Sequence, residues 1–247
     1  MNFEAQTRRW KGILNCLIKK WFWCFVMLVS NIFLGCSLLE KQYEESKFDR
    51  VLVIGNSITH HPPNTEIKWY GDWGMAASEP SKDFFHTLSS SFQNLDNAVT
   101  LKRQNVFVFE RGFDNPFIAD EFEELREFAP DLLIIRLGEN VPLERLETNN
   151  FSIALQDFVG FILDGRKEEV IITSTFWENS QMDTQLKHAA EERGWNYVPI
   201  GHLGSSDTYK AIGEFENEFV EIHPNDAGMA EIAALIWEEV KRIKGKK

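Results

Sequence analysis

Apolar and polar positions alternate along most of the chain in a way that predicts strands separated by helices. Short apolar runs rich in β-branched residues predict strands at residues 50–55, 99–109, 131–137, 170–176 and 197–200. Apolar residues that recur every three or four positions predict helices over residues 81–93, 118–128, 150–163, 181–193 and 226–243. Strands joined through helices form right-handed crossovers, so we expect a mostly parallel sheet that is covered on both faces.

This pattern predicts an α/β fold, a three-layer α/β/α sandwich around a five-stranded, mostly parallel sheet that occupies residues 49–247. Open parallel sheets bind their ligands beyond the carboxyl ends of the strands. The segments that directly follow the strands are therefore where functional residues are expected.

The first 48 residues differ from the remainder in hydropathy and charge. An almost entirely apolar run from Trp21 to Gly35 follows Lys19 and Lys20. Its 15 residues match the core of a signal peptide and fall short of the roughly 20 residues that span a bilayer. Residues 1–35 carry a net charge of +4, so the remainder of a chain whose total is −12 carries −16.

The apolar run ends in Leu34-Gly35-Cys36, which resembles the lipobox of bacterial lipoproteins, although a small residue is more usual at Leu34. The resemblance implies a cleaved signal peptide over residues 1–35, lipidation of Cys36, a tether over residues 36–48 and attachment to a bacterial membrane. Two alternatives remain open, an uncleaved signal anchor and a buried helix. Basic residues before the run and an acidic domain after it place the domain outside the cytoplasm in the lipoprotein and anchor alternatives.

Charge and cysteine content exclude several classes of function. A net charge of −12 provides no basic surface to neutralise phosphates, so nucleic acid is not an expected partner. The only cysteines are Cys16, Cys24 and Cys36, so the main domain has no disulfide, thiol nucleophile or cysteine-ligated metal. His60 and His61 are adjacent and lack an evident third ligand, so neither a metal nor another cofactor is expected.

Serine, asparagine and histidine stand at three places where the predicted topology puts functional residues. The three segments are Gly55-Asn56-Ser57, Gly138-Glu139-Asn140 and His223-Pro224. A serine hydroxyl becomes a nucleophile when a base takes its proton, and histidine has a suitable pKa for that task. A side-chain amide can donate a hydrogen bond to the oxyanion that forms. The combination is typical of acyl transfer.

These three segments resemble sequence blocks of the SGNH hydrolases, the GDSL-type esterases. The first block is usually Gly-Asp-Ser, the third is Gly-x-Asn, and the fifth contains a His-Pro pair; their order and spacing fit residues 50–243. The resemblance implies a flavodoxin-like SGNH fold. It also implies that Ser57 is the nucleophile, His223 the general base, and Asn140 an oxyanion donor together with the Ser57 backbone N–H.

The sequence departs from the family pattern at the acid that normally orients the histidine. Val220 stands where the family usually has Asp, and loss of this acid in a serine protease costs about 10⁴ in rate. Glu221 is the nearest substitute in sequence. Glu139 and Asp226 are further acids, although Asp226 is more simply the N-cap of the last helix. A backbone carbonyl that orients the ring is the remaining alternative.

Other expected site residues follow from the same comparison. Gly112 is the candidate for the glycine of the second block, with Gly74 as its rival, and Asn56 replaces the usual Asp of the first block. Asn56, Trp69 and Trp73 are candidates for substrate binding. Flat indole faces suit the stacking of sugar rings, and packing within the loop is the alternative for the two tryptophans.

The sequence thus predicts a serine esterase for a small acyl ester, with acetylated carbohydrate as the favoured substrate class. A lipase or thioesterase of the same fold is a second enzymatic alternative. A non-catalytic glycan-binding lipoprotein that has lost the triad acid is a third, and a purely structural lipoprotein is a fourth. The expected partners are a small-molecule or glycan ester and, through the N-terminal lipid, a membrane.

Overall fold

The computed structural model describes residues 48–245, and everything reported below concerns this part of the chain. The expected signal peptide over residues 1–35, the lipidation site Cys36 and the tether as far as residue 47 lie outside the described residues. Among the described helices, none has both the length and the apolar character that crossing a bilayer requires.

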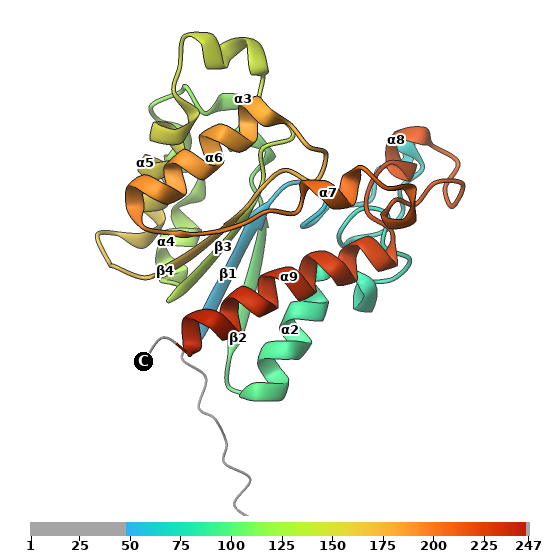
Figure 1. Ribbon diagram of the computed structural model, residues 1–247, viewed down its shortest axis with the longest axis horizontal. Helices are drawn as coiled ribbons and strands as arrows, with labels where there is room; N and C mark the ends of the chain where they lie inside the picture. The colour runs from blue at the N-terminus through green and yellow to red at the C-terminus, as the bar shows by residue number, and fades with distance from the viewer. Residues whose placement is uncertain (1–47, 246–247) are drawn as a thin grey trace, which may run out of the picture. The chain divides into compact units, whose positions relative to one another are not determined.

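Within residues 48–245, five strands form one fully parallel sheet in the order β2-β1-β3-β4-β5 (Figure 1). The strands are β1 (Arg50–Gly55), β2 (Thr100–Asn105), β3 (Leu132–Arg136), β4 (Glu169–Thr173) and β5 (Asn196–Val198). The chain winds in one direction from β1 to β2 and in the other from β3 onward. The carboxyl ends of β1 and β3 therefore flank the switch point at which such sheets bind ligands.

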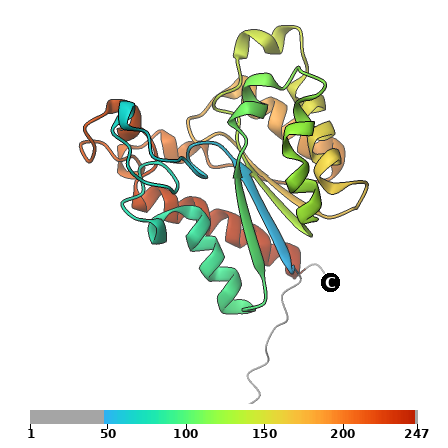
Figure 2. The same cartoon turned by 180° about the vertical axis from the view of Figure 1, so that it is seen from behind.

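Helices cover both faces of the sheet, as Figures 1 and 2 show from opposite sides. One face carries α3 (Phe107–Gly112), α4 (Glu123–Phe128), α5 (Phe151–Leu163) and α6 (Ser180–Arg193). The other face carries α2 (Phe84–Leu95), α7 (Gly201–Gly204) and α9 (Asp226–Lys244). Shorter elements are α8 (Glu218–Glu221) and the 3-10 turns η1 (Thr65–Ile67), η2 (Pro80–Lys82), η3 (Ile118–Phe122), η4 (Leu143–Glu147) and η5 (Asp207–Tyr209). The predicted three-layer α/β/α fold is confirmed.

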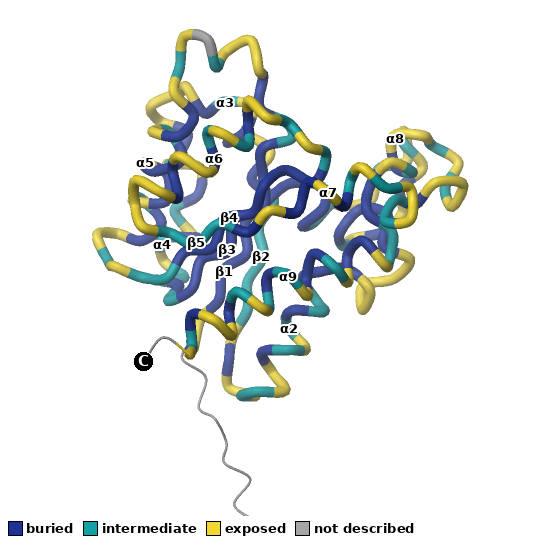
Figure 3. Tube along the Cα trace, in the orientation of Figure 1, coloured by how far each residue is buried: buried dark blue, intermediate teal, exposed yellow. Residues whose placement is uncertain are grey.

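Two apolar cores lie on the two faces of the sheet, and Figure 3 shows the traces of β1 and β3 between them in the colour of buried residues. Alternate side chains of β1 enter opposite cores, because successive residues of a strand point to opposite faces. Leu52 and Ile54 pack under α3 to α6, whereas Val51 and Val53 pack under α2 and α9. A strand that is buried on both faces reads as a continuous apolar run, which is why β1 was predicted with the bounds it has.

The strand predicted over residues 99–109 is wrong in its second half. β2 ends at Asn105, whose side-chain oxygen accepts a hydrogen bond from the N–H of Phe107 at 2.8 Å. This local bond turns the backbone into α3. Val106, which precedes α3, and Phe109 within it are nevertheless buried, and they continue the apolar pattern past the strand end.

Two long connections pack against each other beside the sheet. Residues after β1 and residues between β5 and α9 share a third apolar cluster, formed by Trp69, Met75, Ala76, Ala211 and Val220. Lys68 and Glu216 form an ion pair between the same two segments. Asn225, and not Asp226 as expected, caps α9, because its side chain accepts from the N–H of Gly228. Asp226 instead binds Ser78, and so ties the two connections together.

The tryptophans of the first connection serve as packing residues. Trp69 is 2% exposed, and its indole N–H donates to the carbonyl of His61 at 3.0 Å. Trp73 contacts Trp69 edge-on with ring centroids 5.6 Å apart, and its N–H donates to the carbonyl of Ala77. The expected sugar-stacking role of Trp69 is wrong, since its ring faces are covered, and Trp73 is engaged in the same packing.

Replacing Trp69 tests the contribution of this cluster. Trp69→Ala removes a large buried ring, so we expect a loss of about 3–5 kcal/mol in the free energy of unfolding, measured by denaturant titration. Tyr70 is adjacent but 71% exposed. Tyr70→Ala is therefore the matched control and should stay within about 0.5 kcal/mol of the unsubstituted protein. Equal losses in the two variants would contradict the assignment of Trp69 to a core.

Candidate active site

Ser57 lies in a tight turn directly after β1, at the carboxyl edge of the sheet. The N–H groups of Thr59 and His60 both donate to the carbonyl of Asn56, at 2.9 and 3.0 Å. The backbone at Gly55 runs so close to β3 that an added Cβ would lie 2.2 Å from the carbonyl oxygen of Arg136. The serine therefore sits on a turn, and among the described residues no helix lies between β1 and η1.

The structure brings Ser57 and His223 into hydrogen-bond contact, although 166 positions separate them in sequence. Ser57 Oγ lies 2.9 Å from His223 Nε2. His223 Nδ1 lies 2.7 Å from the carbonyl oxygen of Phe219. A carbonyl oxygen only accepts hydrogen bonds, so Nδ1 carries the proton and Nε2 is left to accept from the serine hydroxyl. The geometry is that of a nucleophile and base oriented by a third group.

The short helix α8 places the orienting carbonyl one turn before the histidine. The side chain of Asn217 accepts from the N–H of Phe219 and starts this turn. The N–H of His223 donates to the carbonyl of Val220 at 3.0 Å and closes it. The ring of His223 is packed edge-on against Trp177 and Phe219, with centroids 5.1 Å away in each case. The histidine is therefore fixed by backbone and aromatic contacts together.

The acids proposed from the sequence as substitutes for the triad Asp are engaged elsewhere. Val220 is fully buried in the third apolar cluster, so its position does not face the imidazole. The carboxylate of Glu221 accepts from the N–H of Gly213 at 3.0 Å, and its expected contact with His223 is not made. Glu139 pairs with Arg136, and Asp226 binds Ser78. Of the alternatives left open, the backbone carbonyl, that of Phe219, is the group that contacts Nδ1 of the ring within the described residues.

Burial controls the charge of His223. Its side chain is 1% exposed, and this desolvation lowers the pKa of His223 to about 4, although the Phe219 carbonyl acts in the opposite direction. The positive charge of Arg136 lowers the pKa further, and Glu139 raises it. The imidazole is therefore neutral at neutral pH, which is the form that can take a proton from Ser57.

Asn140 follows β3 and lines the same cleft as Ser57. One N–H of its side-chain amide donates to Glu110 at 2.8 Å. A primary amide has two donors, so the second N–H remains for a group bound in the cleft. This placement suits an oxyanion donor.

The structure does not bring either candidate glycine of the second block to the cleft. Gly112 is the last residue of α3 and faces Ile118, while the N–H of Gly74 donates to Asp83 at 3.1 Å. Asn105, Phe107 and Val108 line the cleft on the side after β2 instead.

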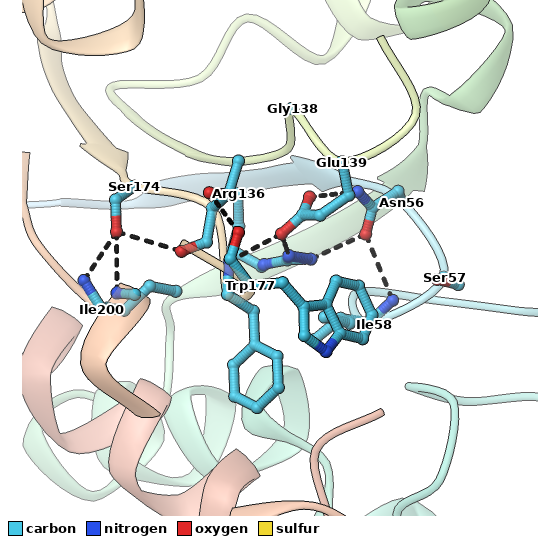
Figure 4. A network of polar contacts seen from close by, with 12 residues as sticks. Asn56, Ser57, Ile58, Arg136, Gly138, Glu139, Ser174, Trp177 and Ile200 are labelled. Carbon is cyan, nitrogen blue, oxygen red and sulfur yellow. Dashed lines mark hydrogen bonds and ion pairs between the residues drawn. The ribbon is translucent and has the colours of Figure 1, made fainter. Parts of the chain in front are cut away.

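A buried polar network lies under the serine turn, and Figure 4 shows Arg136 between Asn56 and Glu139. Arg136 is fully buried; it donates to Asn56 Oδ1 at 2.7 Å and forms an ion pair with Glu139. The Asn56 amide in turn donates to Glu139 at 2.6 Å. Asn56 is 1% exposed, so the expected role in substrate binding is wrong and the residue supports the turn from below.

Two carboxylates in this network have opposite electrostatic surroundings. Burial raises the pKa of Glu110 to about 6, and the charge of Glu139 adds to the effect. Burial also acts to raise the pKa of Glu139, but Arg136 and the N–H of Phe176 outweigh it and hold the pKa below its ordinary value. Sequence reasoning missed both Arg136 and Glu110. An arginine inside an apolar strand was the available signal, because a buried charge requires a partner.

The cleft over Ser57 has a volume of about 470 Å³ and a partly apolar rim. It is lined by Ser57, His60, His61, Pro62, Gln104, Asn105, Phe107, Val108, Asn140 and Phe219. The exposed fractions of Phe107, Val108 and Phe219 are 47%, 49% and 52%. The aromatic faces next to the serine are therefore those of two phenylalanines and not those of the predicted tryptophans.

Comparison with known proteins places the fold. No family model matches the sequence, and no curated protein is detectably similar to it. A two-domain esterase active on acetylated mannans is 17% identical to this chain, with a TM-score of 0.52. The superposition covers 80% of this chain and 50% of the esterase. An acetyl xylan esterase is 12% identical, with a TM-score of 0.51, and the superposition covers 77% of this chain and 99% of that esterase. A protein from Parabacteroides merdae assigned as a GDSL-like lipase is 17% identical, with a TM-score of 0.51. The superposition covers 77% of this chain and 94% of that protein.

These similarities establish that the chain has the fold of the SGNH, or GDSL-type, hydrolases, as the sequence resemblance predicted. The chain spans about half the length of the two-domain esterase. Similarity at sequence identities of 12–17% establishes the fold but not the activity, which has to be argued from the residues of the site.

The depressed pKa of His223 predicts a pH dependence of stability. The unfolded chain binds a proton at this residue near pH 6.5, whereas the folded protein does so near pH 4, so stability is lost as pH falls through this window. We expect the free energy of unfolding of the unsubstituted protein to fall by about 1–3 kcal/mol more than that of His223→Asn between pH 7 and pH 4. Denaturant titrations at the two pH values measure it. Identical pH dependence in both proteins would show that the buried imidazole is not held neutral.

Proposed function

We propose that this protein is a serine esterase of the SGNH type, with Ser57 as nucleophile and His223 as general base. The observation that carries the proposal is the 2.9 Å contact between Ser57 Oγ and His223 Nε2, on a ring whose other nitrogen donates to Phe219. A serine that only capped a turn would not require a buried, neutral histidine aimed at its hydroxyl.

The proposed reaction has two halves. Ser57 Oγ attacks the ester carbonyl while its proton passes to His223 Nε2, and the oxyanion accepts from the Asn140 amide and the Ser57 backbone N–H. The tetrahedral intermediate expels the alcohol, which takes the proton from His223, and leaves an acyl group on Ser57. Water then attacks this acyl group, with His223 again as the base, and releases the carboxylic acid.

The Phe219 carbonyl explains how such a dyad works without an acid. Replacing the triad acid of a serine protease by an amide places the proton on the wrong ring nitrogen, and this accounts for most of the loss in rate. Here the carbonyl keeps the proton on Nδ1, so the tautomer is the productive one. The protein lacks only the negative charge of a carboxylate, which would stabilise the positively charged imidazolium.

Acetylated carbohydrate is the substrate class we favour. Phe107 and Phe219 are half exposed at the rim of the cleft, where flat rings can face a sugar ring while Ser57 meets its ester. Two of the proteins with the same fold are esterases for acetylated mannans and for acetyl xylan. A domain attached outside a bacterial membrane, as the N-terminal sequence suggests, would meet such glycans, and we propose this location together with the activity.

A lipase or thioesterase is a second candidate, and the apolar side chains of Phe107, Val108 and Phe219 favour it. These side chains are equally able to pack against an alkyl chain. The non-catalytic binding alternative uses the same cleft without the chemistry of Ser57.

Hydrolysis of p-nitrophenyl acetate by the purified full-length protein tests the catalytic proposal. Ser57→Ala and His223→Ala should each lower kcat/KM on the order of 10³-fold or more, because nucleophile and base act as a unit. Ser205→Ala and His202→Ala are matched controls at exposed positions and should retain activity. Absence of Ser57-dependent hydrolysis from acetate, butyrate and acetylated glycans would support the binding alternative.

The substrate class is tested by comparing esters on one preparation. We expect acetate release from acetylated mannan or xylan, together with poor hydrolysis of p-nitrophenyl esters of long-chain acids. Faster hydrolysis of the long-chain esters, with no release of acetate from either glycan, would favour the lipase alternative.

A further inference from the structure

We propose that Glu110 is a positioning residue that holds the side-chain amide of Asn140 in place for the oxyanion, and that it does so only as the ionised carboxylate. The catalytic part of this inference rests on the proposed esterase function. Glu110 lies on α3, is fully buried and does not line the cleft, so it acts through Asn140 and not on the substrate.

Four N–H donors converge on the Glu110 carboxylate. Oε1 accepts from the backbone N–H of Gly138 at 2.6 Å, from the backbone N–H of Asn140 at 3.3 Å and from the Asn56 amide at 3.2 Å. Oε2 accepts from the Asn140 amide at 2.8 Å. Glu110 thus accepts hydrogen bonds from both the backbone and the side chain of Asn140, and through Asn56 it links them to the turn that carries Ser57.

This arrangement is matched to the ionised form of the acid. An ionised carboxylate is a pure acceptor with about four sites for hydrogen bonds, and all four contacts here are donors. A proton on Oε1 would face N–H groups instead of an acceptor, and a proton on Oε2 would make that oxygen a poorer acceptor for the Asn140 amide. Protonation therefore displaces a donor from Oε1 or weakens the hydrogen bond at Oε2, and the single contact of Oε2 with the Asn140 side chain is the one most easily lost.

The charged groups around Glu110 determine when this occurs. Beyond the end of β1 lies the neutral Asn56, and the end of β3 contributes Arg136 and Glu139, which pair with each other. On α3 itself, Arg111 points to the carbonyl of Asn140. Burial and the charge of Glu139 raise the pKa of Glu110 to about 6.

The base of the proposed dyad does not titrate in the same range. His223 has a pKa of about 4, so it remains a neutral base while Glu110 takes up its proton. Falling pH should therefore weaken the oxyanion site first, and the acidic limb of the rate profile should report Glu110.

The pH dependence of kcat/KM for p-nitrophenyl acetate tests the inference on the full-length protein. Unsubstituted protein should lose half of its plateau rate near pH 6. Glu110→Gln should have a plateau about 10- to 100-fold lower, less than the loss from removing an oxyanion donor outright, and an acidic limb displaced toward pH 4. Glu121→Gln removes one exposed negative charge and is the matched control, with an unchanged profile.

A second measurement does not depend on hydrolysis and applies also if Glu110→Gln fails to fold. In full-length protein labelled with ¹⁵N-asparagine, the Asn140 side-chain amide signals, assigned with Asn140→Ala, should shift with a midpoint near pH 6. In a folded Glu110→Gln protein this shift should be absent.

The outcomes separate the two proposals. If neither the Ser57 nor the His223 variants lose activity, the esterase proposal is refuted. The titration of the Asn140 amide still decides the role of Glu110. The inference would be overturned if the chemical shifts of the Asn140 amide in the unsubstituted protein did not change between pH 7 and pH 5. So would an active Glu110→Gln protein with an unshifted acidic limb.

Discussion

The hydrogen bond from His223 Nδ1 to the carbonyl of Phe219 is the interaction on which the candidate site depends. It selects the tautomer that leaves Nε2 facing Ser57, and it does so without an ionisable group. The bond exists because α8 forms one turn between Asn217 and the histidine. That turn is held in place by Val220 and Trp69 in the third apolar cluster, so packing far from the serine determines the direction of the imidazole.

The buried polar network imposes a second constraint at the ends of β1 and β3. Arg136 and Glu110 carry charges at fully buried positions, the Glu139 side chain is only 8% exposed, and each of the three requires hydrogen-bonding partners there. Asn56 supplies several of them at once, which accounts for an amide in a segment that otherwise resembles a Gly-Asp-Ser block. A third carboxylate at this position would add negative charge beside Glu110 and Glu139. The network thus connects the serine turn to Asn140 through side chains that never meet the substrate.

Sequence patterns predicted most of the sheet and its helices, because buried strands and amphipathic helices leave a periodic record. They also selected Ser57, Asn140 and His223, which the structure brings to one cleft. The orienting group was left open because a backbone carbonyl has no residue identity. Glu110 was missed because its partners lie near Asn56 and Asn140, far away in sequence. The burial of Trp69 was not predictable either, since irregular loops pack without periodicity.

The tautomer of His223 in the resting protein is the most direct test of this account. Nitrogen-15 chemical shifts of the full-length protein labelled at histidine, with His223 assigned by substitution, report which ring nitrogen carries the proton. We predict at pH 7 a protonated Nδ1 and an unprotonated Nε2, unchanged in Glu221→Gln. A proton on Nε2, or a change of tautomer in Glu221→Gln, would contradict the conclusion that the Phe219 carbonyl has taken the place of the catalytic acid.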